Sequence, residues 1–261
     1  MRRLWILLLA VVIVATAACG GDEDHSGNGS GDGGSADSVT LTVFAAASLK
    51  STFEELGKQF ESEHEGVTLQ FSFAGSSDLV AQIQGGAAAD VFASADENNM
   101  KKLTDDGLNG SEPKIFATNT LTIAVPPDNP AGVASLQDLA KDGLNLVICA
   151  PQVPCGSATQ KVAESAGLDL KPVSEEQSVT DVLTKVTSGE ADAGLVYVTD
   201  AKSAGDKVEA IDFPESDAVV NRYPIAEVKD SQHADLAQEF IDLVTGEEGQ
   251  QVLSEAGFGA P

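Results

Sequence analysis

The stretch VTLTVFAAASLK (Val39–Lys50) passes from the period of a β-strand to that of an α-helix. Apolar residues alternate with threonine up to Val43, as in a strand with one buried face, and from Leu49 onward they recur at helical spacing. A strand therefore meets a helix near Ser48. The first N–H groups of a helix lack partners and carry partial positive charge, so this junction is suited to an anion. Serine is also a favoured N-cap, and capping alone would explain Ser48.

Strand-like and helix-like segments alternate from Val39 to the C-terminus, which predicts an α/β protein with parallel sheets flanked by helices. In such open sheets, ligands collect beyond the carboxyl ends of the strands. After the first strand and helix, the pattern predicts strands at 67–73, 89–95, 120–125, 144–150, 193–197 and 223–228, and helices at 78–84, 97–106, 136–141, 157–166, 180–188, 234–244 and 247–256.

Four of the predicted helix starts carry small or hydroxyl-bearing residues. They are Ser48, Ser76-Ser77, Cys155-Gly156-Ser157 and Ser178-Val179. Capping explains each serine separately, but it does not explain why strand ends read AAAS, AGSS and PCGS. Small residues let a ligand approach the backbone closely. The pattern therefore favours one anion site built from uncharged N–H and O–H donors.

The N-terminal segment 1–18 has the features of an export signal. Arg2 and Arg3 precede an apolar run that is shorter than the ~20 residues needed to span a bilayer. The run ends in TAACG, which resembles the lipobox of bacterial lipoproteins and predicts a diacylated Cys19 anchored to the outer face of the cell membrane. An ordinary secretory signal is the alternative. Residues 19–38 lack large apolar side chains, which predicts a flexible tether.

The chain is strongly acidic, with 15 Lys+Arg against 41 Asp+Glu and a formal net charge of −26. Such a surface repels nucleic acid and anionic lipid headgroups, so neither is expected as a partner. An anion bound by this chain must be held by something other than a basic patch.

Enzymatic and metal-binding motifs are absent from the sequence. It contains no G-x-S-x-G, and its histidines, His25, His64 and His233, lie beside no plausible nucleophile, so an exported hydrolase is disfavoured. It also contains no H-E-x-x-H and no C-x-x-C, and no direct metal-ion ligands or cofactors are expected. A ferric-ion receptor usually needs adjacent tyrosines, whereas this chain has only Tyr197 and Tyr223.

Several motifs together resemble the periplasmic molybdate-binding proteins of ABC transporters. They are VFAAASL (43–49), FAGSSDLVAQIQGGAAADVFASAD (73–96), VPCG (153–156), GLVYVTDA (194–201) and the C-terminal GFG (257–259). The resemblance implies a two-lobed type II binding-protein fold, each lobe a mostly parallel sheet flanked by helices. Lobe 1 would comprise 39–119 plus 222–261, and lobe 2 would comprise 120–221.

The same resemblance implies the ligand and its donors. Molybdate, and with it tungstate, would bind in the cleft between the lobes, and a monomer would deliver it to an ABC transporter permease. The donors would be the hydroxyls of Ser48 and Ser76, the backbone N–H groups of Cys155 and Val179, and the hydroxyl of Tyr197. Position 155 is commonly alanine in relatives, but a backbone donor survives that change. The main alternative is a receptor for sulfate or another small oxyanion.

Two cysteines, Cys149 and Cys155, remain once Cys19 is lipidated. Exported proteins meet an oxidising environment, and an even number of thiols predicts a disulfide between them. The alternative is a buried Cys149 in its strand and a free Cys155.

Overall fold

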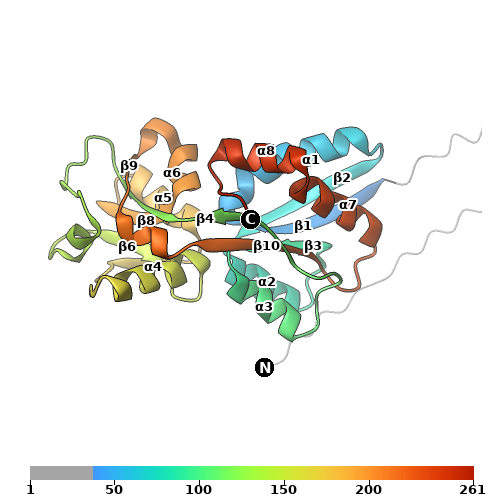
Figure 1. The fold of residues 1–261 in the computed structure, drawn as a ribbon, viewed down its shortest axis with the longest axis horizontal. Helices are drawn as coiled ribbons and strands as arrows, with labels where there is room; N and C mark the ends of the chain where they lie inside the picture. The colour runs from blue at the N-terminus through green and yellow to red at the C-terminus, as the bar shows by residue number, and fades with distance from the viewer. Residues whose placement is uncertain (1–37) are drawn as a thin grey trace, which may run out of the picture. The chain divides into compact units, whose positions relative to one another are not determined.

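The computed structural model describes residues 38–261, which form two β-sheets with helices packed against them (Figure 1). The expected signal segment, Cys19 and all of the expected tether except Ser38 lie outside the described residues. Within the described part of the chain, no helix is both long and apolar enough to cross a membrane.

The first sheet has the strand order β2-β1-β3-β10-β4. Strand β1 pairs in parallel with β2 and β3, whereas β10 runs antiparallel to β3 and β4. Its strands are β1 (Val39–Ala46), β2 (Val67–Ala74), β3 (Val91–Ala93), β4 (Lys114–Asn119) and β10 (Asn221–Glu227). Its helices are α1 (Lys50–Glu63), α7 (Ala234–Thr245) and α8 (Glu247–Ala256) on one face, and α2 (Ser76–Gln84) and α3 (Glu97–Asp105) on the other (Figure 1).

The second sheet repeats this plan with the order β7-β6-β8-β5-β9. Strand β6 is parallel to β7 and β8, and β5 is antiparallel to β8 and β9. Its strands are β5 (Leu121–Val125), β6 (Leu146–Cys149), β7 (Ser174–Glu176), β8 (Ala193–Tyr197) and β9 (Glu209–Ile211). Its helices are α4 (Pro154–Ser165), α5 (Val179–Thr187) and α6 (Val198–Ala204), with short 3₁₀ turns at Leu136–Ala140, Gly205–Lys207 and Pro214–Ala218.

Each sheet has one strand that runs antiparallel to the other four: β10 in the first sheet and β5 in the second. The chain reaches each of these two strands directly from the other sheet. The chain leaves β4 at Asn119 and begins β5 at Leu121, and it returns through β10, which begins at Asn221. Asn119 and Asn221 are direct partners in the β4–β10 pairing. The two crossings therefore lie side by side, and the mostly parallel, two-lobed fold expected from the sequence is confirmed.

Aromatic side chains fill the core beneath α1 and α7. Phe53 is fully buried and contacts Phe240 edge-on, with ring centroids 5.7 Å apart, and it also packs against Phe71 and Phe116. The opposite face of the first sheet has a separate cluster that includes Phe92 of β3. Burial on both faces explains why the central strands are almost continuously apolar.

Several elements differ from the sequence expectations. Strands β4, β7 and β9 and helix α6 were not expected, and segment 136–141 forms a 3₁₀ turn rather than an α-helix. Helix α4 begins at Pro154 instead of Ser157, because proline suits the first helical turn, where its missing N–H removes no helical hydrogen bond. Strands β7 and β9 are three-residue edge strands, too short to give a periodic signal.

Candidate functional site

The five residues expected to bind the ligand line a single small pocket. Its walls come from the ends of β1, β2 and β8 and from the starts of α2, α4 and α5. Its volume of about 10 Å³ leaves room for about one water molecule. The lining residues are Ala46, Ala47, Ser48, Ala74, Gly75, Ser76, Ala95, Val153, Pro154, Cys155, Val179 and Tyr197.

A larger cavity of about 440 Å³ adjoins this pocket, and the two share Ala47 and Ser48. Lys50 and Glu54 lie on its first-sheet side, and Asp200 and Lys202 lie on the other. Its charged lining differs from the uncharged lining of the small pocket, so the small pocket is the better candidate for the anion site.

Ser48 and Ser76 form the half of the site that belongs to the first sheet. Ser48 lies in a 3₁₀ turn between β1 and α1 and caps neither helix; its hydroxyl shares a hydrogen bond of 3.0 Å with the Tyr223 hydroxyl. Ser76 is the first residue of α2, and its Oγ accepts the N–H of Ala95 at 3.0 Å. The explanation that these serines only cap their helices is therefore wrong.

Cys155 and Val179 belong to the half of the site on the second sheet. Cys155 lies in the first turn of α4, and Val179 is the first residue of α5. N–H groups in a first turn have no preceding helical carbonyl to bind, so both are available to a ligand. Ser178 is a true N-cap, since its Oγ accepts the N–H of Asp181 at 3.2 Å.

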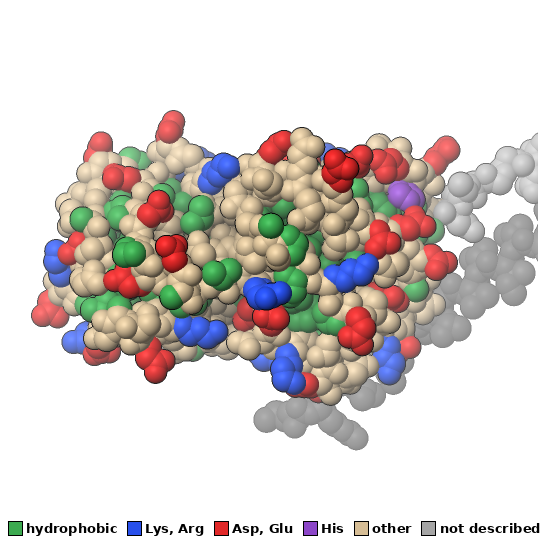
Figure 2. Space-filling model, viewed as in Figure 1, with side chains coloured by type: hydrophobic (Ala, Val, Ile, Leu, Met, Phe, Trp, Pro, Cys, Tyr) green, Lys and Arg blue, Asp and Glu red, His purple; other side chains and the backbone are tan. Residues whose placement is uncertain are grey.

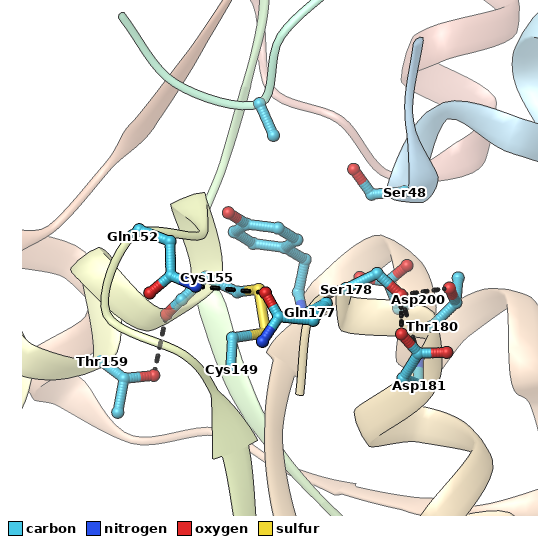
Figure 3. Close-up of a disulfide and its surroundings, with 12 residues drawn as sticks. Ser48, Cys149, Gln152, Cys155, Thr159, Gln177, Ser178, Thr180, Asp181 and Asp200 are labelled. Atoms are coloured by element: carbon cyan, nitrogen blue, oxygen red, sulfur yellow. Dashed lines mark hydrogen bonds between the residues drawn. A yellow bond between two sulfur atoms is a disulfide. The ribbon is translucent and has the colours of Figure 1, made fainter. Parts of the chain in front are cut away.

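A disulfide joins Cys149 at the end of β6 to Cys155, as the sequence predicted (Figure 3). The two Cα atoms are 5.7 Å apart. The Thr159 hydroxyl donates to the Cys155 carbonyl at 2.8 Å, and the amide of Gln152 donates to Gln177 at 3.1 Å. The loop that presents the Cys155 N–H is therefore held against strand β6 and against the loop before α5. In Figure 3, Ser48 lies across from this disulfide loop.

Tyr197 ends β8 with its side chain 1% exposed. Its hydroxyl oxygen accepts a hydrogen bond of 2.9 Å from the amide of Asn221. Burial, followed by the neighbouring Tyr223, raises the pKa of Tyr197 well above its ordinary value. Tyr197 therefore remains a protonated donor, and the raised pKa disfavours the phenolate that a ferric ion would require.

No charged side chain occurs among the described residues that line the pocket, although acidic side chains are spread over the surface (Figure 2). Behind the pocket, burial raises the pKa of Asp200 to about 7, and the hydrogen bond from the Tyr197 N–H opposes that rise. Across residues 38–261, no three His, Cys, Asp or Glu side chains group closely enough to hold a metal ion. The pocket is thus suited to an anion held by dipoles rather than by ion pairs.

The residues that support the five donors were not predicted from the sequence. Tyr223 was assigned only to a strand, yet it is fully buried with its hydroxyl on Ser48. Asn119 and Asn221 end segments expected for lobe 1 and lobe 2, and the structure shows that their side chains also contact Thr199 and Tyr197. An asparagine at the end of each crossing strand, next to an expected lobe boundary, is the signal that could have pointed to them.

The chain is similar to known solute-binding proteins over most of its length. The family model described as "Bacterial extracellular solute-binding protein" matches residues 41–259. The "Molybdate-binding protein ModA" of Mycobacterium tuberculosis is 49% identical over 222 residues, covering 85% of each chain.

Solved structures share the fold. The periplasmic molybdate-binding protein of Azotobacter vinelandii superposes with a TM-score of 0.75 at 26% identity, covering 85% of this chain and 99% of that one. The sulfate-binding protein SubI of M. tuberculosis has a TM-score of 0.69 at 19% identity, covering 84% and 86%, and at that identity it supports the fold alone.

Proposed function

Because this chain belongs to the bacterial extracellular solute-binding protein family, we propose that it captures molybdate outside the cell membrane and delivers it to an ABC importer. The observation that carries the proposal is the convergence of Ser48, Ser76, Cys155, Val179 and Tyr197 on one uncharged pocket. Molybdate is a tetrahedral dianion that only accepts hydrogen bonds. Hydrogen bonds to such a charged acceptor are roughly twice as strong as neutral ones.

The proposed ligand set divides between two lobes. Lobe 1, residues 39–119 plus 222–261, supplies the hydroxyls of Ser48 and Ser76. Lobe 2, residues 120–221, supplies the Cys155 and Val179 N–H groups and the Tyr197 hydroxyl. Since only the closed arrangement gives the anion every donor, binding favours closure of the lobes.

Competitive calorimetric titration of molybdate, tungstate and sulfate at one ionic strength tests the ligand. Tungstate, of nearly the same size, should bind almost as well as molybdate. If the smaller sulfate loses two charge-assisted bonds of about 1.5–3 kcal/mol each, it should bind at least ~100-fold more weakly. Sulfate binding within tenfold of molybdate would favour the general oxyanion receptor, and steady turnover of model esters would favour an exported hydrolase instead.

The protein acts, in this proposal, as a monomer held at the outer face of the cell membrane by a diacylated Cys19. The TAACG motif supports the anchor. Replacing Cys19 by serine should release the protein from the membrane fraction while leaving molybdate affinity unchanged. Retention of the Cys19→Ser protein in that fraction would argue against a lipid anchor.

A further inference from the structure

One contact between the lobes lies outside the anion pocket and involves a charged side chain. Lys202 of α6, which packs on the second sheet, donates a hydrogen bond of 2.7 Å to the carbonyl oxygen of Glu255 in α8, which packs on the first sheet. The two helices are in contact and lie along the upper edge of Figure 1. Every ion pair among residues 38–261 joins residues of the same lobe. Lys202 is therefore the one charged side chain in that part of the chain that hydrogen-bonds across the lobes.

The acceptor of this bond is a carbonyl at the C-terminal end of α8. The last carbonyls of a helix have no helical N–H to bind and carry partial negative charge, which favours a cation beside them. The chain leaves α8 through Gly257, whose φ is 100°, and the two N–H groups of this turn donate to the carbonyls of Ser254 and Leu253. The turn leaves the Glu255 carbonyl to Lys202.

The C-terminal GFG motif holds this acceptor in place. A Cβ at Gly257 would lie 3.2 Å from Lys202 Cδ, so glycine gives room to the lysine stem as well as to the turn. Phe258 is buried in the core, and the N–H and carbonyl of Gly259 exchange hydrogen bonds of 2.9 Å with Thr118 in β4, next to the crossing into the second sheet. The end of α8 is thus fixed to the lobe of the first sheet, and separation of the lobes draws Lys202 away from it.

Lys202 lies between the lobes but away from the anion pocket. It lines the cavity of about 440 Å³ and is not among the residues that line the small pocket. Its bond to α8 therefore forms in the closed arrangement whether or not an anion is bound. Because the side chain is exposed, the bond is modest in strength and favours closure without locking it.

We propose that Lys202 is a positioning residue that clasps the end of α8 and favours closed lobes before the anion arrives. The inference rests on the proposed function, and it adds a contact that sets the affinity without touching the ligand. The apparent dissociation constant of a ligand is its intrinsic value divided by the fraction of protein in the binding-competent state. A clasp that raises the closed fraction of the ligand-free protein therefore tightens binding.

The variant Lys202→Met tests the clasp, because it keeps an apolar stem and removes the donor. Loss of the bond should lower the closed-to-open ratio about fivefold, roughly 1 kcal/mol. Small-angle X-ray scattering should give the ligand-free variant a larger radius of gyration than the wild type, and saturating molybdate should bring both proteins to the same value. Molybdate affinity, measured by calorimetry, should fall about two- to fivefold.

The variant Lys50→Met is the matched control. Lys50 lines the same cavity, and its Nζ lies 3.9 Å from a carboxylate oxygen of Glu54 in its own lobe. Its replacement removes the same charge beside the pocket but no bond between the lobes. The radius of gyration of ligand-free Lys50→Met should therefore equal that of the wild type.

The outcomes separate the two proposals. An unchanged radius of gyration in ligand-free Lys202→Met, or the same changes in Lys50→Met, overturns the clasp while the molybdate proposal stands. A wild-type protein that binds none of molybdate, tungstate and sulfate overturns the proposed function, and the scattering comparison of the ligand-free proteins still tests the clasp.

Discussion

The two halves of the site use different donors for the same task. In the half on the first sheet, the candidate donors are the side-chain hydroxyls of Ser48 and Ser76, held by Tyr223 and by Ala95. In the other half, two candidate donors are backbone N–H groups at helix starts, and a disulfide ties one of them to its strand. A hydroxyl can be deleted by one substitution, whereas a backbone donor can only be displaced. The hydroxyl donors are therefore sensitive to the loss of one atom, whereas the two backbone donors of the second half are sensitive to displacement of the helix starts that carry them.

The largest expected effect concerns Asp200, a buried carboxyl in the second half. Its pKa is raised from 3.8 to about 7, so the folded state binds its proton more tightly than the unfolded state does. The resulting stability is complete below pH ~4 and is lost as the pH rises to about 7. At about 1.4 kcal/mol per pKa unit, Asp200→Asn should be more stable than wild type by about 4 kcal/mol above pH 8.

Urea unfolding of both proteins between pH 4 and pH 8 measures this difference. The stability advantage of Asp200→Asn should vanish at the acid end of the range. A constant difference across the range would mean that Asp200 ionises normally. Asp96 is the matched carboxyl of the first half; burial raises its pKa too, but the N–H and amide of Asn99 oppose the rise.

A substitution at Gly75 tests whether the two halves of the site come into contact. A Cβ at this residue would lie 2.1 Å from the carbonyl oxygen of Gln177, across the cleft. Gly75→Ala should therefore hold the lobes apart and weaken molybdate binding at least ~100-fold, about 2.8 kcal/mol, while the melting temperature of the ligand-free protein stays nearly unchanged.

Gly156 is the matched control within the second half. Its Cβ would lie 1.9 Å from the Ala150 carbonyl oxygen of the same half, so opening the cleft cannot relieve the clash. Gly156→Ala should lower the melting temperature itself. Similar melting temperatures for both variants, or normal affinity in Gly75→Ala, would contradict closure around the anion.

Deleting one hydroxyl from each half compares them directly. Tyr197→Phe keeps the apolar packing of the ring and removes one bond to a charged ligand, which should cost about 1.5–3 kcal/mol of binding free energy. Ser76→Ala should cost a similar amount and also leave the Ala95 N–H without its acceptor. Calorimetry with molybdate measures both, and unchanged affinity in either variant would assign that residue a purely structural role.

The smallest expected effect is that of the disulfide. Loop-closure entropy for so short a ring gives roughly 2 kcal/mol of stability, which Cys149→Ser with Cys155→Ser should remove. Molybdate affinity should fall less than in Tyr197→Phe, since the Cys155 N–H is displaced rather than deleted. Mass spectrometry of the unreduced wild-type protein checks the premise, because two alkylatable thiols would exclude the bridge.

The sequence alone determined the alternation of strands and helices and the segments that could supply donors. Local periodicity locates an element because each apolar residue must face the core, which is why 193–197 and 247–256 were predicted with the bounds that the structure gives. Small residues and serines at helix starts likewise indicated Ser48, Ser76 and Val179 without any tertiary information. Cysteine number and export were enough to predict the pair Cys149 and Cys155.

Only the tertiary structure decided which groups orient those donors. From the sequence, the Ser48 hydroxyl could equally have capped its helix, but in the fold β10 places Tyr223 beside it and the two hydroxyls share a hydrogen bond. Tyr197 has a directional partner only because Asn221 lies at a crossing between the sheets. Short edge strands such as β7 escaped prediction because their pairing, not their composition, makes them strands. The raised pKa of Asp200 has the same origin, since burial depends on residues distant in sequence and no local pattern encodes it.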